Sequence, residues 1–282
     1  MTMLSINTNV GAMRSADASY SVNKSMETSM NRLSSGKRIN GAGDDAAGIQ
    51  IANRMNTEIM GLQQAVRNAA DSQAFLMTAE GALEEVHAML LRIRELSVQA
   101  ANGTLEAADR TSLQAEVTVL EAEIDRVNSN TEWGGKKIFS ATLSAGITTQ
   151  LGVDNSQTIT TSIYQVHHSN TPAAGGGRNL GMTGSITTAA AARSHLASVD
   201  TAISRVSSDR GRYGATINRL EHSISNFQNI ATNLATAKGR IEDADFAAET
   251  SNLARTQVLQ QASMAMLAQA NASKQNILAL FQ

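Results

Sequence analysis

The chain has 282 residues and a formal net charge of −2, so it is long enough for one or two domains and its charge does not suggest broad nucleic-acid binding. Hydrophobic residues make up 42% of the chain but aromatic residues only 3%, which favours thin layers of aliphatic side chains over a thick globular core. One Pro and no Cys permit long helices and exclude disulfides and thiol catalysis. No run is apolar enough for a membrane span, and MTMLSINTNVGAM at the start does not resemble a secretory signal.

The first predicted helix leads into a glycine-rich stretch, GAGDDA (41–46), that has the letter pattern GxGxxA of a dinucleotide-binding loop. That loop needs a strand before it, but the apolar spacing over 22–33 predicts a helix. Asp44 and Asp45 would also repel a phosphate at the start of the next helix. The alternative, a joint between two helices with Gly36 as the C-cap and Asp44 as the N-cap, fits these residues better.

A seven-residue apolar repeat follows the joint and predicts a coiled-coil seam. One row is Met55, Leu62, Ala69, Leu76, Leu83 and Leu90, and the second is Ala79, Val86, Ile93 and Ala100. We therefore expect a helix over about 45–100, roughly 80 Å long at 1.5 Å per residue. Asn102-Gly103 ends it, and spacings of three and four predict a second helix over about 105–128.

The middle of the chain changes to a period of two, which predicts a β-hairpin over about 146–163. A Gly/Thr-rich surface excursion is expected over about 165–188. The heptad pattern then returns, with a row at Val199, Val206, Tyr213, Leu220, Phe227, Leu234 and Ile241. It predicts a helix over about 189–238, in which Arg210 occupies an inward position and is the exception.

Both ends of the chain, residues 1–34 and 243–282, form weaker amphipathic helices rich in Ala, Gln, Asn, Ser and Met. Neither end has a bundle or sheet of its own to cover its apolar stripe, so neither should stay folded alone. Such ends indicate surfaces that need partners. Met26, Met30, Met264 and Met266 fit interface packing better than a ligand site.

The residues that could carry chemistry do not form a catalytic or metal-binding pattern. None of the five histidines stands in HExxH or another metal spacing, and GxSxG is absent. The pair His167-His168 could bind a metal weakly, but a solvated loop pair is the simpler interpretation. We therefore expect no enzyme, cofactor or metal.

Four stretches of the sequence resemble bacterial flagellin. They are SINTNV (5–10), RLSSGKRINGAGDDAAGIQIANRM (32–55), LRIRELSVQAANGT (91–104) and QANASKQNILALFQ (269–282). The resemblance implies a mainly α fold, a long antiparallel coiled-coil or helical-bundle rod with a small β-hairpin, and termini paired as an inner coiled coil. By similarity, residues 1–43 and 242–282 form the inner domain and 44–241 the rod domain. Large outer domains are absent, since only the excursion stands in their place.

The implied function is a structural subunit that polymerises into the flagellar filament, the propeller for swimming, outside the cell after unfolded export through the flagellar type III system. Implied partners are other copies, the export chaperone, the filament cap and hook-junction proteins, and neither nucleic acid nor membrane. Two alternatives stay open: a hook–filament junction protein, and an enzyme or binding module built on a coiled coil. The expected polymerisation residues are Val10, Met13, Tyr20, Leu267, Ile277, Leu278 and Phe281, and the inter-domain spoke is Gly36, Gly41, Gly43 and Asp44.

Two further expectations concern the rod. By resemblance, Arg92, Leu96 and Glu116 match flagellin residues recognised by Toll-like receptor five, and the spacing of Arg92 and Leu96 places them on one helix face, off the seam. Flagellins also often carry O-linked glycans on outward loops, although a plain polar loop fits equally. The candidate hydroxyls are Thr148, Thr149, Thr158, Thr160, Thr161, Ser162, Ser169 and Thr171.

Overall fold

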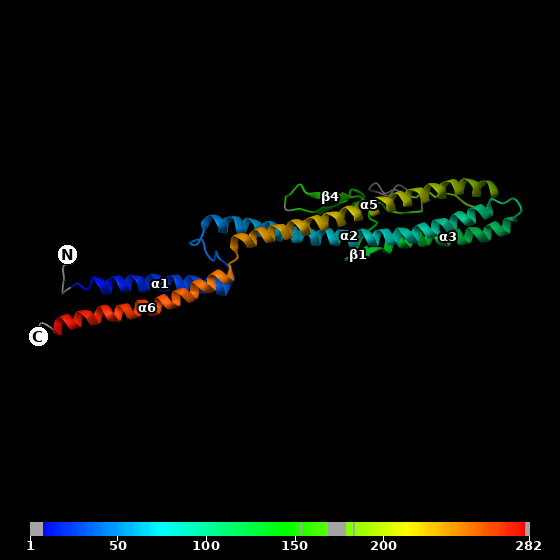
Figure 1. Cartoon of the computed structure of the whole chain (residues 1–282). Coiled ribbons are helices and arrows are strands. Elements are labelled where there is room, and N and C mark those ends of the chain that lie inside the picture. The colour runs from blue at the N-terminus through cyan, green and yellow to red at the C-terminus, as the bar shows by residue number, and fades with distance from the viewer. Residues whose placement is uncertain (1–7, 153, 169–178, 183, 280–282) are drawn as a thin grey trace. The chain divides into compact units, whose positions relative to one another are not determined.

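The computed structural model describes residues 8–152, 154–168, 179–182 and 184–279, apart from the side chains of 141 and 274–279. Its helices are α1 Val10–Ser35, α2 Ala46–Ala100, α3 Ala107–Asn130, α4 Ala141–Ser144, α5 Ala189–Glu242 and α6 Phe246–Ala279, and its strands are β1 Glu132–Trp133, β2 Lys136–Lys137, β3 Ile147–Gln150 and β4 Thr158–Thr161. The mainly helical fold with a small β-hairpin and paired termini is confirmed (Figure 1). No described helix is long and apolar enough to cross a membrane.

The chain divides into two compact units. The first joins Met1–Ile59 to Thr232–Gln282, and the second is Met60–Ala231. Both divisions fall inside continuous helices, α2 and α5, whereas the boundaries expected from the sequence stand at the joint, at 43/44 and 241/242.

The second unit is held together by the heptad seams of its long helices. The apolar rows of α2 from Leu62 to Ala100 are buried, as are Val199, Val206, Tyr213 and Leu220 of α5. Val117 and Ile124 of α3 complete the same core. Thin, evenly spaced aliphatic layers explain how so few aromatic residues suffice.

The inward-pointing Arg210 of α5 is accommodated by acidic residues on α2. Its Nε and Nη2 atoms both donate to Glu80 Oε1, at 2.9 and 2.7 Å, and Glu84 lies 3.8 Å from Nη2. About a quarter of the Arg210 side chain stays exposed, so the guanidinium keeps part of its hydration. The break in the apolar row is therefore a paired charge rather than a packing defect.

A second polar contact inside the seam joins Ser97 of α2 to His195 of α5. Ser97 Oγ donates to the Ile93 carbonyl at 2.8 Å, so it accepts from His195 Nδ1 at 3.0 Å. His195 Nε2 has no hydrogen-bond partner among the described residues, and Glu121 Oε1 lies 3.7 Å from it. This pair was not predicted, although Ser97 continues the heptad row, seven residues after Leu90.

Two β-hairpins follow α3. In the larger one, β3 pairs antiparallel with β4, and it packs on α2 through Ser72 Oγ, 2.7 Å from Thr149 Oγ1. The smaller one, β1 with β2, turns at Gly134 and Gly135, whose φ angles are +55° and +77°. This smaller hairpin was not predicted, although Gly-Gly between short strands is a signal for a two-residue hairpin.

The start of the excursion is fixed to α3 by an Asp125 carboxylate. Asn128 Oδ1 accepts from the Val166 amide at 2.9 Å, so Asn128 Nδ2 donates to His167 Nε2. His167 Nδ1 must then carry the hydrogen that faces Asp125 Oδ1, and His168 Nδ1 lies 2.8 Å from Oδ2. The histidine pair, which was expected to be solvated, is instead half-buried and contacts the Asp125 carboxylate. No group of ligands suited to a metal occurs among the described residues.

Candidate self-assembly surface

Helices α1 and α6 form an antiparallel pair within the first unit (Figure 1). Asn9 Nδ2 donates to the Ala270 carbonyl at 3.2 Å near one end of the pair. Further along, Gln260 Nε2 donates to Asn23 Oδ1 at 2.7 Å. These contacts between residues far apart in sequence fix the register of the two helices.

The pair exposes much of its apolar surface. Large apolar side chains stand exposed on α1 and α6: Val10, Met13, Tyr20, Met30, Phe246, Val258, Leu259, Met264 and Met266. Among the described side chains of the two helices, the buried ones are instead polar: Ser19, Ser29 and Glu249. Burial of apolar area is the main stabilising term for such helices. A pair with this distribution gains most of its possible stabilisation only when further chains cover it.

The expected polymerisation residues fall into three groups. Val10, Met13 and Tyr20 are exposed, Tyr20 to 75%, and Leu267 is half-buried. The side chains of Ile277, Leu278 and Phe281 lie outside the described residues. The exposed apolar residues Phe246, Val258 and Leu259 were missed, and their exposure is not readable from a pattern that marks apolar positions but not their partners.

The joint between α1 and α2 is stabilised by backbone contacts with the α5–α6 connection. Gly36 ends α1 with φ +71°, a left-handed conformation that favours glycine. Its carbonyl accepts from the Ala244 amide at 3.0 Å, and the Arg38 amide donates to the Glu242 carbonyl at 2.6 Å. Lys37 Nζ lies 2.5 Å from Glu242 Oε1. The Lys37 ammonium, with Lys238 beyond it, lowers the pKa of Glu242.

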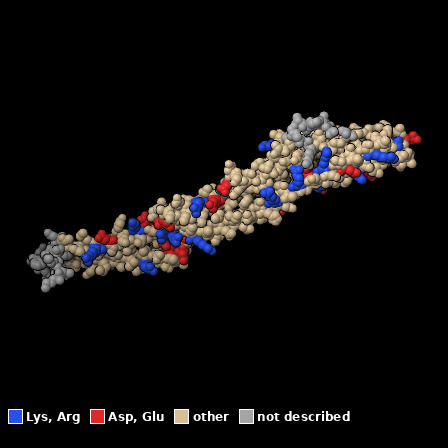
Figure 2. All heavy atoms as spheres, turned by 90° about the horizontal axis from the view of Figure 1, so that it is seen from above, with Lys and Arg blue, Asp and Glu red and all other residues tan. Residues whose placement is uncertain are grey.

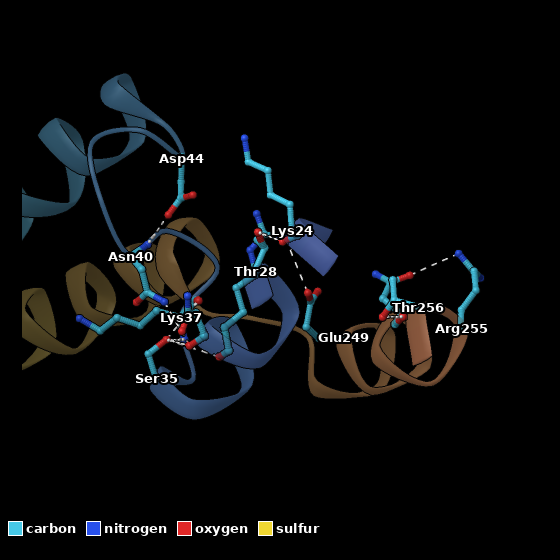
Figure 3. Close-up of polar contacts among 12 residues, drawn as sticks. Lys24, Thr28, Ser35, Lys37, Asn40, Asp44, Glu249, Arg255 and Thr256 are labelled. Atoms are coloured by element: carbon cyan, nitrogen blue, oxygen red, sulfur yellow. Dashed lines mark hydrogen bonds and ion pairs between the residues drawn. The ribbon is translucent and has the colours of Figure 1, made fainter. Parts of the chain in front are cut away.

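Part of the predicted role of the spoke residues is wrong. Asp44 does not cap α2; its Oδ2 accepts from the Asn40 and Gly41 amides and closes the preceding turn (Figure 3). Those two amides lower the Asp44 pKa. Asp45 is the cap, with Oδ1 accepting from the Ala47 and Gly48 amides at 3.1 and 2.8 Å. Two adjacent aspartates both fit a cap, and only backbone geometry separates them.

The glycines of the joint also differ from expectation. Gly36 has a positive φ, whereas Gly41 and Gly43 do not, and a Cβ on either of these two would meet open space. Gly48, which the sequence analysis passed over, is buried. A Cβ there would lie 2.7 Å from Ile39 Cδ1, so this glycine permits the close approach of the joint to α2.

A polar groove of about 290 Å³ runs between α1 and α6, lined by Ser25, Thr28, Ser29, Arg32, Glu249, Asn252, Arg255 and Thr256. In Figure 3, Glu249 lies between Thr28 of α1 and the Thr256–Arg255 turn of α6. The Arg32 Nη1 to Glu249 Oε1 distance is 3.9 Å, a long ion pair. None of the described hydroxyl groups that line the groove is paired with a side chain that could act as its general base. The groove therefore offers packing contacts rather than a catalytic site.

The residues expected to meet the innate immune receptor do not share one exposed face. Arg92 Nε and Nη2 donate to Glu116 Oε1 at 2.9 and 2.7 Å, and both side chains are about half exposed. The hydrogen bond to Glu116, then that to Glu95, raises the Arg92 pKa. Leu96 is only 1% exposed and belongs to the core. Placing it off the seam was wrong, because the buried stripe of α2 is wider than the two heptad rows.

The candidate hydroxyls likewise divide between exposed and inward positions. Thr148, Thr158 and Thr160 are exposed. Thr149 and Thr161 are half-buried and line a small apolar cavity beside α2, so they are less exposed than expected. Successive side chains of a β-strand point to opposite faces of the sheet, which explains this division. Ser162 is half-buried, while Ser169 and Thr171 lie outside the described residues.

Together these features define a mainly helical chain whose terminal helix pair exposes many large apolar side chains. On the face that Figure 2 shows, basic and acidic side chains are interspersed. The models for the bacterial flagellin N-terminal and C-terminal helical regions match residues 6–144 and 196–281.

Individual relatives agree with the family models. Flagellin of Bacillus subtilis is 39% identical over 98% of this chain and 99% of its own length, and flagellin of Halalkalibacterium halodurans is also 39% identical over the same shares. A solved Vibrio parahaemolyticus structure described as a putative flagellar hook-associated protein aligns with a TM-score of 0.57 over 71% of this chain and 100% of that chain, but at 18% identity, and so shows the fold alone. The chain belongs to the bacterial flagellin family. It is a structural subunit of the flagellar filament and not an enzyme, and the relatives give no support to the hook-junction alternative.

Proposed function

We propose that the α1–α6 pair supplies the decisive polymerisation contacts of this filament subunit. The observation that carries the proposal is the exposure of large apolar residues on both helices, while the buried positions among the described side chains are polar. Fully burying one such side chain gives about 1.5–3 kcal/mol of transfer free energy. Several per subunit offset the ordering and association costs of joining the polymer.

The direction of the exposed residues supports contacts on more than one side. Met264 and Met266 are two residues apart, which turns them about 200° from each other around α6, and both are more than half exposed. Tyr20 and Met13 extend the apolar surface to α1. Neighbouring copies on several sides of the pair cover all of these apolar side chains, whereas a single flat partner leaves some of them in water.

The exposed apolar surface of the α1–α6 pair also supports the other expected partners, namely the export chaperone, the filament cap and the hook-junction proteins. The proposed route to the flagellum is unfolded export through the flagellar type III system, with the export chaperone covering the apolar face of α6 until assembly. The filament cap and hook-junction proteins then meet subunits at the two ends of the polymer. Exposed Val258 and Leu259 on α6 support this assignment, since an uncovered apolar helix face invites aggregation.

Recognition by Toll-like receptor five is a second proposed function, and the Arg92–Glu116 pair supports it. The pair joins α2 to α3 on the surface of the second unit, where both side chains are accessible in the free subunit. Leu96 contributes from beneath by packing rather than by direct exposure. The free subunit should activate the receptor, and the filament should not if subunit packing covers the pair.

The polymerisation proposal is tested by seeded growth with two matched variants. Val258 of α6 and Val119 of α3 are 66% and 68% exposed, so an aspartate at either position has a similar direct effect on the isolated chain. Val258→Asp should abolish elongation of filament fragments in sedimentation and electron microscopy, while Val119→Asp should retain it. Deletion of residues 263–282 should also prevent elongation and weaken chaperone capture, while the seams of the second unit stay folded. Normal growth by Val258→Asp and by the deletion variant would refute the proposal.

A further inference from the structure

Three exposed methionines gather in one stretch of the α1–α6 pair. Met13, Met264 and Met266 are 61%, 58% and 62% exposed. All three fall between the two hydrogen bonds that fix the pair, Asn9 to Ala270 and Gln260 to Asn23. All three side chains are therefore accessible to solvent in the isolated chain.

The thioether adds a property that leucine at the same positions would lack. Leucine and methionine bury similar apolar area, so interface packing alone does not require sulfur. Methionine is oxidised to a sulfoxide, which turns an apolar side chain into a polar, chiral one. Other methionines serve as internal references: Met182 is 2% exposed in the core of the second unit, and Met77 is 54% exposed on α2.

We propose that Met13, Met264 and Met266 are modification sites at which a hydroperoxide oxidises the free subunit and blocks its entry into the filament. The inference rests on the proposed polymerisation role of the α1–α6 pair. The free subunit exposes the sulfurs and the assembled subunit covers them. Oxidation therefore acts before assembly, and assembly protects against it.

The reaction balances without a metal or cofactor. A lone pair of the Met sulfur attacks one peroxide oxygen, the O–O bond breaks, and a proton passes to the leaving oxygen to give water or an alcohol. Sulfur is oxidised by two electrons and the peroxide is reduced by two. A methionine sulfoxide reductase of the thiol-dependent class reverses the step, because two thiols become a disulfide and the sulfoxide oxygen leaves as water.

The effect on assembly follows from desolvation. A sulfoxide oxygen is a strong hydrogen-bond acceptor, and burying it without a donor costs more than burying a thioether gains. Three sulfoxides per subunit should raise the subunit concentration needed for elongation by at least about tenfold.

The test oxidises free subunits with hydrogen peroxide, removes the peroxide, and measures elongation of unoxidised filament fragments by sedimentation. Peptide mass mapping should find a gain of about 16 Da, one oxygen, at the three positions in free subunits. The same positions should be protected in filaments, and Met182 should be protected in both states. Treatment with the reductase and a thiol should restore elongation.

A triple variant, Met13→Leu with Met264→Leu and Met266→Leu, should elongate after peroxide treatment, while the control Met77→Leu should be inhibited like the native chain. Equal inhibition of the triple variant would overturn the proposal. If the triple variant does not assemble untreated, partly oxidised native subunits decide the matter. Their sulfoxides at the three positions must be enriched in the fraction that stays soluble, and equal abundance in soluble and pelleted fractions refutes the inference. Normal elongation by untreated Val258→Asp subunits would instead refute the polymerisation role of the α1–α6 pair.

Discussion

Replacing Gly48 with alanine should loosen the joint between α1 and α2. The added Cβ would lie 2.5 Å from Asp45 Oδ2 and 2.7 Å from Ile39 Cδ1, both closer than side chains tolerate. Displacing Asp45 removes the cap of α2, at a cost of about 1 kcal/mol. Moving buried Ile39 adds about 1–3 kcal/mol, and the better helix propensity of alanine returns at most about 1 kcal/mol. The joint should lose about 1–3 kcal/mol of local stability.

Gly81 provides the matched control, because it lies in the same helix, is exposed, and a Cβ there would meet open space. Gly81→Ala should stabilise its surroundings by up to about 1 kcal/mol through helix propensity alone. Native-state hydrogen exchange resolves both effects locally: amides in the first turn of α2 should exchange faster in Gly48→Ala, and those around residue 81 more slowly in Gly81→Ala. Unchanged or slower exchange at the joint in Gly48→Ala would show that the close approach does not matter.

Three further predictions concern pH, the receptor and modification. Because Lys37 lowers the Glu242 pKa in the folded joint, this ion pair contributes fully above about pH 4.3 and is lost as pH falls through the lowered value. Hydrogen exchange at the joint should therefore be faster in Glu242→Gln than in the native chain at neutral pH, and the difference should vanish once acid has protonated Glu242. A difference that persists after Glu242 is protonated would contradict this. Arg92→Asp should abolish receptor signalling by the free subunit in a reporter-cell assay, and unchanged signalling would reject the assignment. Intact-mass measurement of native filament should show added sugar if exposed Thr148 or Thr160 is glycosylated, whereas the unmodified mass would exclude it.

The long helices of the second unit were predictable because each buries a regular stripe. Leu83, Leu90 and Val86 lie at heptad spacing, and the structure buries all of them. The caps were less predictable, since Asp44 and Asp45 have the same chemistry and only the direction of the preceding turn distinguishes them. Sequence spacing determines which residues share a helix face, but backbone geometry determines which of two neighbours closes a turn.

Contacts that depend on how a further helix packs against α2 were the least predictable. Leu96 stands outside the two heptad rows and is nevertheless buried, and His195 meets Ser97 only because α5 crosses at that level. For the assembly surface, the sequence marked apolar positions on both terminal helices. It could not show that Val258 points away from α1, because helix pairing leaves one face of each helix covered and the choice of face depends on the register.

The most direct test of the account is a helical reconstruction of filament grown from this chain, at a resolution that shows side chains. We expect α1 and α6 of each subunit to stay paired in the innermost layer, with Met13, Tyr20 and Val258 buried against neighbouring copies. A filament in which these three side chains remain in solvent, or in which only the second unit makes contacts between subunits, would contradict it.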